Sequence, residues 1–552
     1  MSYHERRKLI LILARAGTKN ISRQNIRLVN DKPLIYYVIN ASLQIKSADV
    51  FVSTDSEEIK QMSLLYGVNV ICRPKSLTKD STSTEDTAYH ALSYLDPKNL
   101  VYEKCLIINP HFPLIKPSTI NRFFSLLNKQ IQTIFGFEKQ DASEYCTIKD
   151  NKTNEKITEL NLFESNIVQR KKIVSFNCEK FLKYKKFQKP EYGIQLDDYE
   201  IFSPRSYHDF GVLEKIINRK RILVRLHGSK TIGLGHVYNM LTILNQFRNE
   251  EILVMMNVKN SLGSKKMEEN LYNIRLFSNE TEFFDIMSRF KPDIIFNDIL
   301  NTEENYIKKL KKQNLFIVNF EDLGNGRKFA DLVFNPIFDS KKRFKNEYYG
   351  SNYACVRDEF RIFSRKDLRK VVKKIVITLG GVDYNNNTYR ILEIIKKSNI
   401  LMDVVIDVIL GFSFAHQSKL MTLVNDMRQM GYQIFVIEQT NLLSKYIVDA
   451  DFVITSNGRT VFEVASLKIP IISISVNSRE KQHNFVKKSH VGFHVDFNNK
   501  SAAKNLIKCV DAMLDYKIRL KLIKNLDRIN LRKGISRVVR IIMSEYEKTI
   551  NV

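Results

Sequence analysis

The chain lacks the features that mark secreted, metal-binding and membrane-spanning proteins. Its six cysteines stand singly, without a CxxC pair or a cluster with metal-ligand spacing, which is typical of reduced thiols in a cytoplasmic protein. No apolar run approaches the roughly 20 residues that cross a bilayer. The basic start leads into an apolar run too short for a signal peptide. These absences predict a cytoplasmic protein without a transmembrane segment.

Acidic residues are outnumbered: 60 Asp and Glu stand against 87 Lys and Arg, and the formal net charge is +27. Such a balance fits anionic substrates, nucleic acid, a membrane surface or a compositional bias. The basic residues are spread along the chain, and no nucleic-acid-binding motif is recognisable. We therefore expect anionic small-molecule partners and no nucleic acid, and leave a peripheral membrane contact open.

Length and hydrophobic pattern divide the chain into three parts. Its 552 residues exceed one compact domain, and the alternation of strand-like and helix-like segments restarts near residues 219 and 366. We expect α/β domains at 1–218, 219–365 and 366–552, the first built on a mostly parallel sheet with helices on both faces. Its predicted strands are 9–13, 49–53, 105–108 and 133–137, and its predicted helices are 34–43 and 57–66. The polar residues 140–200 predict an insertion that covers the site or pairs with a second subunit.

The loop after the first predicted strand carries the clearest chemical signal. Gly17 lets the backbone turn close to a bound group, and Arg15, Lys19 and Arg23 place three cations around that turn. A strand that ends in such a loop suits phosphate binding. A surface turn in a basic protein would have the same spacing, so spacing alone leaves both interpretations open.

The wider segment resembles the CMP-sialic acid synthetases, also called acylneuraminate cytidylyltransferases, which open with A-R-x-G-S-K-x-I-P-x-K-N-I and G-K-P-L-I. Residues 14–35 follow that pattern, and residues 52–59 match V-S-T-D-x-E-E-I. The resemblance covers about residues 8–218. It implies a Rossmann-like nucleotidyltransferase domain that transfers CMP from CTP to a nonulosonic acid sugar, with Mg²⁺ as cofactor and a homodimer as assembly. The residues that it implies for CTP binding are Arg15, Gly17, Thr18, Lys19, Asn25, Arg73 and Asp80.

Several positions depart from that family pattern. Gln24 replaces a phosphate-facing Lys, and residues 109–115 replace Q-P-T-S-P-L-R. The D-I-D pair of Mg²⁺ ligands appears as residues 200–202, where Phe202 cannot bind a metal. Glu200 is then either a lone ligand or a solvated surface acid. The identity of the metal ligands therefore stays unknown.

Residues 225–240 carry a second signal, between a predicted strand and a predicted helix. Gly233 and Gly235 permit close backbone approach to a substrate, and His236 follows at the start of the helix. A helix N-terminus favours the neutral, basic form of a histidine. A tight turn with an exposed histidine would have the same spacing.

This segment resembles the UDP-sugar hydrolases of the pseudaminic acid pathway, which are related to GT-B glycosyltransferases. The family's I-G-x-G-H-V stands at 232–237, and residues 378–383 and 450–463 match its nucleotide-binding segments. The resemblance implies a two-lobed GT-B-like module in which His236 activates or orients a water at the anomeric carbon. The residues that it implies for UDP-sugar binding are Gly233, Gly235, Gly380, Gly381, Thr460, Glu463 and Gln482, with the ribose on Glu463.

The second resemblance has departures too. His227 replaces the Asp of R-x-D, and Asn239 stands where an Arg usually follows G-H-V-x. An acid beside the sugar is thus missing, and His227 becomes a competitor of His236 for the role of the base. Asp298 fits the family's D-x-Y region without its Tyr.

Together the two halves predict a fusion of two enzymes that act on CTP, a nonulosonic acid and a UDP-sugar. Two alternatives stay open. The C-terminal part is a glycosyltransferase if its cleft holds a wide, often apolar acceptor site. The protein is a scaffold that binds nucleotide sugars without turnover if the changes at Gln24, Phe202 and His227 have abolished catalysis.

Overall fold

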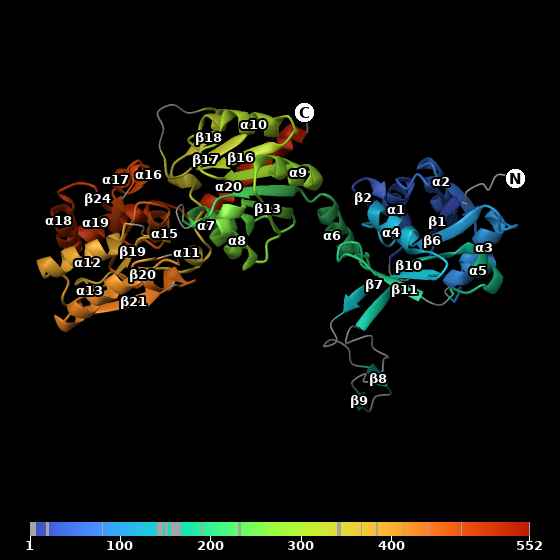
Figure 1. Cartoon of the computed structure of the whole chain (residues 1–552), viewed down its shortest axis with the longest axis horizontal. Coiled ribbons are helices and arrows are strands. Elements are labelled where there is room, and N and C mark those ends of the chain that lie inside the picture. The colour runs from blue at the N-terminus through green and yellow to red at the C-terminus, as the bar shows by residue number, and fades with distance from the viewer. Residues whose placement is uncertain are drawn as a thin grey trace. The chain divides into compact units, whose positions relative to one another are not determined.

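The computed structural model describes residues 7–17, 21–79, 81–140, 147–149, 153–155, 167–188, 191–229, 233–338, 344–365, 367–381, 383, 385–412, 414–438, 440–475 and 477–550. The chain divides into two compact units, Met1–Asn218 and Arg219–Val552. The division falls where the hydrophobic pattern first restarts. Both units consist of sheets and helices (Figure 1), so the predicted α/β class is confirmed.

The first unit is built on a seven-stranded sheet in the order β11-β7-β10-β6-β1-β4-β5. Neighbouring strands run parallel except at β10, which is antiparallel to β6 and to β7. The strands are β1 (Arg7–Leu13), β4 (Ala48–Thr54), β5 (Asn69–Cys72), β6 (Tyr102–Ile108), β7 (Thr133–Gln140), β10 (Ile167–Asn177) and β11 (Glu191–Gln195). The helices are α1 (Leu34–Leu43), α2 (Glu57–Leu65), α3 (Thr84–Leu95), α4 (Pro117–Leu126), α5 (Cys178–Tyr184) and α6 (Tyr207–Ile217).

Both faces of β1 are buried, which explains its continuous apolar sequence. Ile10 and Ile12 pack in one cluster with α1 and α4, and Leu9 and Leu11 pack in another with α3 and α5. The sheet grows from β1 toward β4 on one side and toward β6 on the other. Ligands of open α/β sheets bind at the carboxyl ends of the strands beside such a switch point.

The predicted insertion at 140–200 needs a correction. β10, α5 and β11 all lie in this range, and the two strands are members of the main sheet. The sequence pattern failed there because polar residues dilute the strands. Two short pairs accompany the sheet, β2 (Leu28–Val29) with β3 (Lys32–Pro33) and β8 (Thr147–Lys149) with β9 (Thr153–Glu155).

The second unit contains two parallel sheets, each the centre of one lobe. The first lobe has the order β14-β13-β12-β15-β16-β17-β18. Its strands are β12 (Arg221–Leu226), β13 (Glu251–Asn257), β14 (Ile274–Phe277), β15 (Ile294–Asp298), β16 (Phe316–Phe320), β17 (Leu332–Asn335) and β18 (Glu347–Tyr349). Its helices are α7 (Gly235–Leu244), α8 (Ser261–Glu268), α9 (Glu280–Phe290) and α10 (Glu304–Lys311).

The second lobe has the order β21-β20-β19-β22-β23-β24. Its strands are β19 (Lys374–Thr378), β20 (Val405–Leu410), β21 (Gln433–Glu438), β22 (Phe452–Ser456), β23 (Ile471–Ser475) and β24 (Gly492–Asp496). Its helices are α11 (Glu359–Ile362), α12 (Asn387–Ser398), α13 (Gln417–Gln429), α14 (Leu443–Ile447), α15 (Thr460–Ser466), α16 (Ser478–Lys481), α17 (Phe485–Lys488), α18 (Ala502–Leu514) and α19 (Tyr516–Asp527). Two successive parallel α/β lobes are the GT-B-like arrangement that the sequence predicts.

Helix α20 (Gly534–Ile550) corrects the predicted boundary between the lobes. Its buried residues Val538, Ile542 and Tyr546 belong to the core of the first lobe, and Figure 1 shows the red helix among the green elements of that lobe. Tyr546 stacks edge-on against Phe316 of β16. The predicted range 366–552 therefore omits α11, whose Phe360 packs in the core of the second lobe, and includes one helix that returns to the first lobe. An amphipathic pattern shows that a helix is half-buried but not which core it covers.

Candidate functional site

A cavity of about 420 Å³ lies between the two lobes of the second unit. It is lined from both sides by glycine-containing turns at the carboxyl ends of strands, where ligands of α/β folds bind. The predicted residues that the cavity brings together are Gly233, Gly235, His236, Gly380, Gly381, Thr460 and Glu463. The sequence therefore located the cavity from residues that are far apart in the chain.

His236 is held by a carboxylate that the sequence analysis did not assign to it. The histidine is the second residue of α7 and is 8% exposed, and its Nδ1 lies 2.5 Å from Oδ1 of Asp298. Asp298 is the last residue of β15, which pairs with β12 directly before the glycine turn. A carboxylate can only accept, so Nδ1 carries the proton and Nε2 keeps a free lone pair for base catalysis.

Asp298 is fully buried and stays ionised. Burial raises its pKa, but the charge that His236 carries when protonated, the hydrogen bond from His236, the charge of Arg459 and a hydrogen bond from Asn239 together lower it. Asn239 Nδ2 donates to Asp298 Oδ2 at 2.8 Å. The change from Arg to Asn at this position thus leaves a residue that helps to fix the acid behind His236.

His227 occupies a different environment from His236. Its backbone N–H donates to the carbonyl of Asp298, and its Nδ1 is buried without a hydrogen-bond partner among the described residues. Burial, helped by the charges of His236 and Arg225, lowers the pKa of His227 to about 4. It is half-buried and is not among the residues that line the cavity. Of the two histidines, His236 is the one that lines the cavity.

The opposite wall of the cavity is formed by backbone turns that suit a diphosphate. Gly380 has a φ of 80°, and Gly411 lies so close that a Cβ there would come within 2.3 Å of the Gly380 carbonyl. The N-terminus of α12 is already capped, because Asp383 accepts from the N–H groups of Asn387 and Thr388 at 2.8 Å each. The glycine turns therefore remain as backbone donors in this wall, beside the hydroxyl groups of Ser456 and Thr460 that also line it.

Two predicted UDP-sugar residues differ from expectation. Glu463 lines the cavity as predicted, but its carboxylate also accepts from Arg357 Nε at 2.7 Å and from Nη2 at 3.2 Å, so it is half of a partly buried ion pair, and its binding of a ribose stays a prediction. Gln482 is exposed at the C-terminal end of α16 and does not line the cavity. Asn477 and Glu480 line it in its place, because a four-residue helix turns only part of the segment inward.

The first unit gathers its predicted residues at the switch point. Asn25 is buried and donates to the Arg15 carbonyl at 3.0 Å, while Asp55 accepts from the backbone N–H after Arg15 at 2.9 Å. Arg73 donates to the carbonyl of Ser53, the penultimate residue of β4, at 2.8 Å. Burial, with the nearby charge of Arg15, lowers the pKa of Arg73. Two cations thus lie where a triphosphate would bind, and Gly17 is exposed beside them.

Three predicted CTP residues, Thr18, Lys19 and Asp80, lie outside the described residues. Arg23, the third cation of the predicted turn, pairs with Glu58 at 2.7 Å.

The residues that would hold Mg²⁺ do not fit the ion. Glu200 is 2% exposed and accepts from the backbone N–H of Lys116 at 2.8 Å, so it is neither a surface acid nor a ready ligand. Asp209 forms a capping box with Ser206 at the start of α6. Phe202 packs on an apolar cluster. Within the described parts of the chain, no three His, Cys, Asp or Glu side chains form a group that could hold a metal.

Gln24 does not take over the role of the missing Lys. It is buried and donates to the Pro204 carbonyl at 2.6 Å. The replacement of the family's Lys by Gln24 thus changes a phosphate-facing position into a buried hydrogen bond between two segments of the chain.

Comparison with known proteins finds relatives with similar sequences. Residues 9–220 match the family model described as cytidylyltransferase. Over 116 residues the chain is 34% identical to CMP-N,N'-diacetyllegionaminic acid synthase of Legionella pneumophila, covering 21% of this chain and 50% of that enzyme. The chain spans about half the length, 58% and 50%, of two of the curated relatives that it matches.

Two further relatives match over lengths that exceed the first unit. One is the pseudaminic acid cytidylyltransferase and UDP-2,4-diacetamido-2,4,6-trideoxy-beta-L-altropyranose hydrolase of Helicobacter pylori, 23% identical over 426 residues, 72% of this chain and 77% of that protein. The other is the spore coat polysaccharide biosynthesis protein SpsG of Bacillus subtilis, 24% identical over 332 residues, 58% of this chain and 96% of that protein. Both predicted resemblances are confirmed. No helix in the described ranges has the length and apolar character that a membrane span requires.

Proposed function

We propose that the protein joins two activities on nucleotide sugars, CMP transfer from CTP to a nonulosonic acid in the first unit and hydrolysis of a UDP-sugar in the second. The His236–Asp298 contact at 2.5 Å, at the edge of an interlobe cavity, is the observation that carries the hydrolase proposal. The similarity of residues 9–220 to the cytidylyltransferases supports the transferase.

The hydrolysis follows from the tautomer of His236. With Nδ1–H held by Asp298, Nε2 accepts a proton from a water as its oxygen attacks the anomeric carbon of the sugar. The bond from that carbon to the diphosphate oxygen breaks, and UDP leaves with the electron pair. Asp298 stabilises the imidazolium that forms and holds the ring in position. The glycine turns at 380–381 hold the diphosphate in this scheme.

In CMP transfer the oxygen of the anomeric hydroxyl of the acid sugar attacks the α-phosphorus of CTP. The bond from that phosphorus to the pyrophosphate oxygen breaks, pyrophosphate leaves with the electron pair, and the hydroxyl proton passes to solvent. Arg15 and Arg73 provide positive charge for the phosphates at the switch point. Because Glu200 and Phe202 provide no ligands, we expect a low rate or a weak dependence on Mg²⁺. We also propose that the protein is a homodimer, which sedimentation of the purified chain would test.

The decisive experiment incubates the full chain with substrates of each kind. UDP release is measured from UDP-N-acetylhexosamines, with and without a sugar acceptor, and pyrophosphate release is measured from CTP plus N-acetylneuraminic, legionaminic or pseudaminic acid, with and without a chelator. Release of UDP that needs an acceptor would replace the hydrolase by a glycosyltransferase. No release in either assay, together with nucleotide binding by calorimetry, would establish a non-catalytic scaffold.

A further inference from the structure

The cavity contains a buried acid that the proposed hydrolysis does not use. Glu321 directly follows β16, lines the cavity and is 5% exposed. Its φ of 53° lies in the left-handed region, which is strained for a residue with a side chain. Such strain persists only where the surrounding structure enforces it, and it gathers at functional sites.

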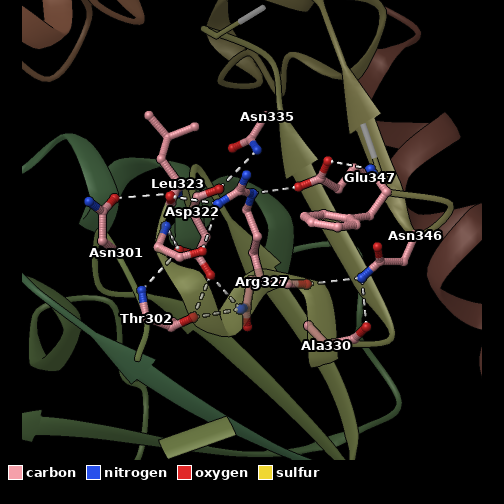
Figure 2. Close-up of polar contacts among 12 residues, drawn as sticks. Asn301, Thr302, Asp322, Leu323, Arg327, Ala330, Asn335, Asn346 and Glu347 are labelled. Atoms are coloured by element: carbon pink, nitrogen blue, oxygen red, sulfur yellow. Dashed lines mark hydrogen bonds and ion pairs between the residues drawn. The ribbon is translucent and has the colours of Figure 1, made fainter. Parts of the chain in front are cut away.

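The enforcing structure is the neighbouring residue Asp322, whose carboxylate is completely satisfied inside the first lobe (Figure 2). Oδ1 accepts from the backbone N–H groups of Thr302 and Gly324, at 2.9 and 2.8 Å. Oδ2 accepts from Thr302 Oγ1 and Asn319 Nδ2, at 2.6 and 2.7 Å. Burial raises the pKa of Asp322, and these bonds oppose that shift. Asp322 is therefore a structural acid with no capacity left for a ligand.

Other polar contacts fix the turn that follows. Asn335 Nδ2 donates to the Asp322 carbonyl at 3.0 Å, and Arg327 donates to two carbonyls of the turn at 2.8 and 2.9 Å (Figure 2). Arg327 also pairs with the buried Glu347 at 2.8 Å. The backbone on the C-terminal side of Glu321 is thus held rigidly.

The Glu321 side chain, in contrast, keeps capacity for a ligand. Its Oε1 lies 3.0 Å from Nη2 of Arg459, which comes from the other lobe. Both atoms are buried, and neither makes a hydrogen bond of acceptable geometry with the described residues. The contact is therefore an ion pair in which one acceptor and one donor remain unused.

The position of this pair determines which part of the substrate it can contact. Arg459 Nη2 is 3.7 Å from Oδ2 of Asp298, the acid behind His236. The pair thus lies beside the acid that holds His236, and Glu321, Arg459 and His236 all line the same cavity. In the proposed hydrolysis the sugar ring lies at His236. A hydroxyl group is both donor and acceptor, so one sugar hydroxyl can donate to Glu321 and accept from Arg459.

We infer that Glu321 and Arg459 form the sugar-recognition site of the cavity, binding a hydroxyl substituent of the nucleotide-linked sugar. This inference rests on the proposed UDP-sugar substrate. The inference assigns the sugar specificity to a charged pair with one residue from each lobe. The sugar is therefore recognised only where the two lobes meet. The pair also supplies an acid beside the sugar in place of the one lost at His227.

The test compares the affinities of the full chain for UDP and for UDP-N-acetylglucosamine or UDP-N-acetylgalactosamine by calorimetry. Glu321→Gln keeps the shape and removes the charge. It should weaken UDP-sugar binding at least about tenfold and leave UDP binding within about twofold, since hydrogen bonds to charged groups are the strong ones. Glu347→Gln is the matched control: it breaks a buried ion pair outside the cavity and should lower the melting temperature without changing the ratio of the two affinities.

The outcomes separate the inference from the function on which it rests. Equal losses of affinity for UDP and for the UDP-sugar would show that Glu321 only holds the two lobes together, and would overturn the inference. Unchanged affinity for both ligands would also overturn it. A wild-type chain that binds neither UDP nor a UDP-sugar would overturn the proposed function and the inference together. Turnover of a UDP-sugar by wild type and Glu321→Gln with the same KM would overturn the inference alone.

Discussion

The proposed role of His236 as a base depends on one buried neighbour, Asp298. Replacing His236 by Asn should lower UDP-sugar turnover by roughly 10²–10⁴-fold, the usual contribution of a positioned base. UDP affinity should stay close to that of the wild type, because the diphosphate turns lie on the other lobe. UDP release and UDP calorimetry on the same variant measure both effects.

His227→Asn is the control for that variant, because His227 lies outside the cavity wall. It should keep most of the activity. Loss of activity in His227→Asn with retention in His236→Asn would reverse the two roles.

Arg15 is one of the two residues of the first unit that we expect to provide positive charge for the phosphates of CTP. Arg15→Ala should weaken CTP binding by roughly 1.5–3 kcal/mol, the value of a charge-assisted contact. Arg23→Ala is the matched control, since Arg23 pairs with Glu58 on the surface and should change the affinity by under about 1 kcal/mol. Equal effects of both variants in CTP calorimetry would mean that general positive charge, not a site at Arg15, attracts the nucleotide.

Residues of the candidate sites could be predicted from the sequence only where they belong to one local motif. The Gly233–His236 turn and the loop at Arg15 were found because each follows an apolar strand. Asp298 was not assigned as the partner of His236, because their contact depends on β15 lying next to β12. Strand order is a property of the folded sheet, and a distance along the chain does not reveal it.

At the scale of elements, α20 covers part of the core of the first lobe. Ile542 is fully buried in the core of the first lobe. Ile542→Ala should destabilise the second unit by about 2–5 kcal/mol through lost burial and the cavity that remains. Ser544→Ala on the exposed side of the same helix should be nearly neutral. Denaturant unfolding of both variants checks this, and similar stabilities would show that α20 does not complete the core.

Elements with a continuous apolar run or a clear helical period were predicted well. The predicted helix at 34–43 has the bounds of α1, and the predicted strand at 9–13 lies within β1. The mostly apolar segment at 371–379 extends beyond β19, which begins at Lys374, because Val371 is 65% exposed and does not enter the sheet. An apolar segment forms a strand only where its backbone also pairs with a neighbouring strand.

For the molecule as a whole, three histidines should make the second unit sensitive to acid. Burial is the largest cause that lowers the pKa of His227, His483 and His494 to about 4 each. In the unfolded chain a histidine titrates near about 6.5. Between these values the unfolded state binds more protons than the folded state, so stability falls as the pH falls from about 6.5 toward 4.

Thermal unfolding of the full chain from pH 7 to 4.5 measures this loss. His494→Gln should flatten the dependence, because it removes one of the three groups while an amide can still hydrogen-bond to Ser473 and Ser475, which His494 contacts. A melting temperature that stays constant over this range would show that the buried histidines do not control the stability of the unit.

The return of α20 to the first lobe has a consequence for how the protein is made. A nascent chain that has already emerged with every strand of both lobes still lacks the helix that covers part of the first core, near Phe316. That apolar surface stays exposed to chaperones and proteases until the whole second lobe has been synthesised. A chain that ends anywhere before α20 therefore leaves an apolar surface exposed in the first lobe, far from the point where synthesis stopped, and cellular quality control can remove it.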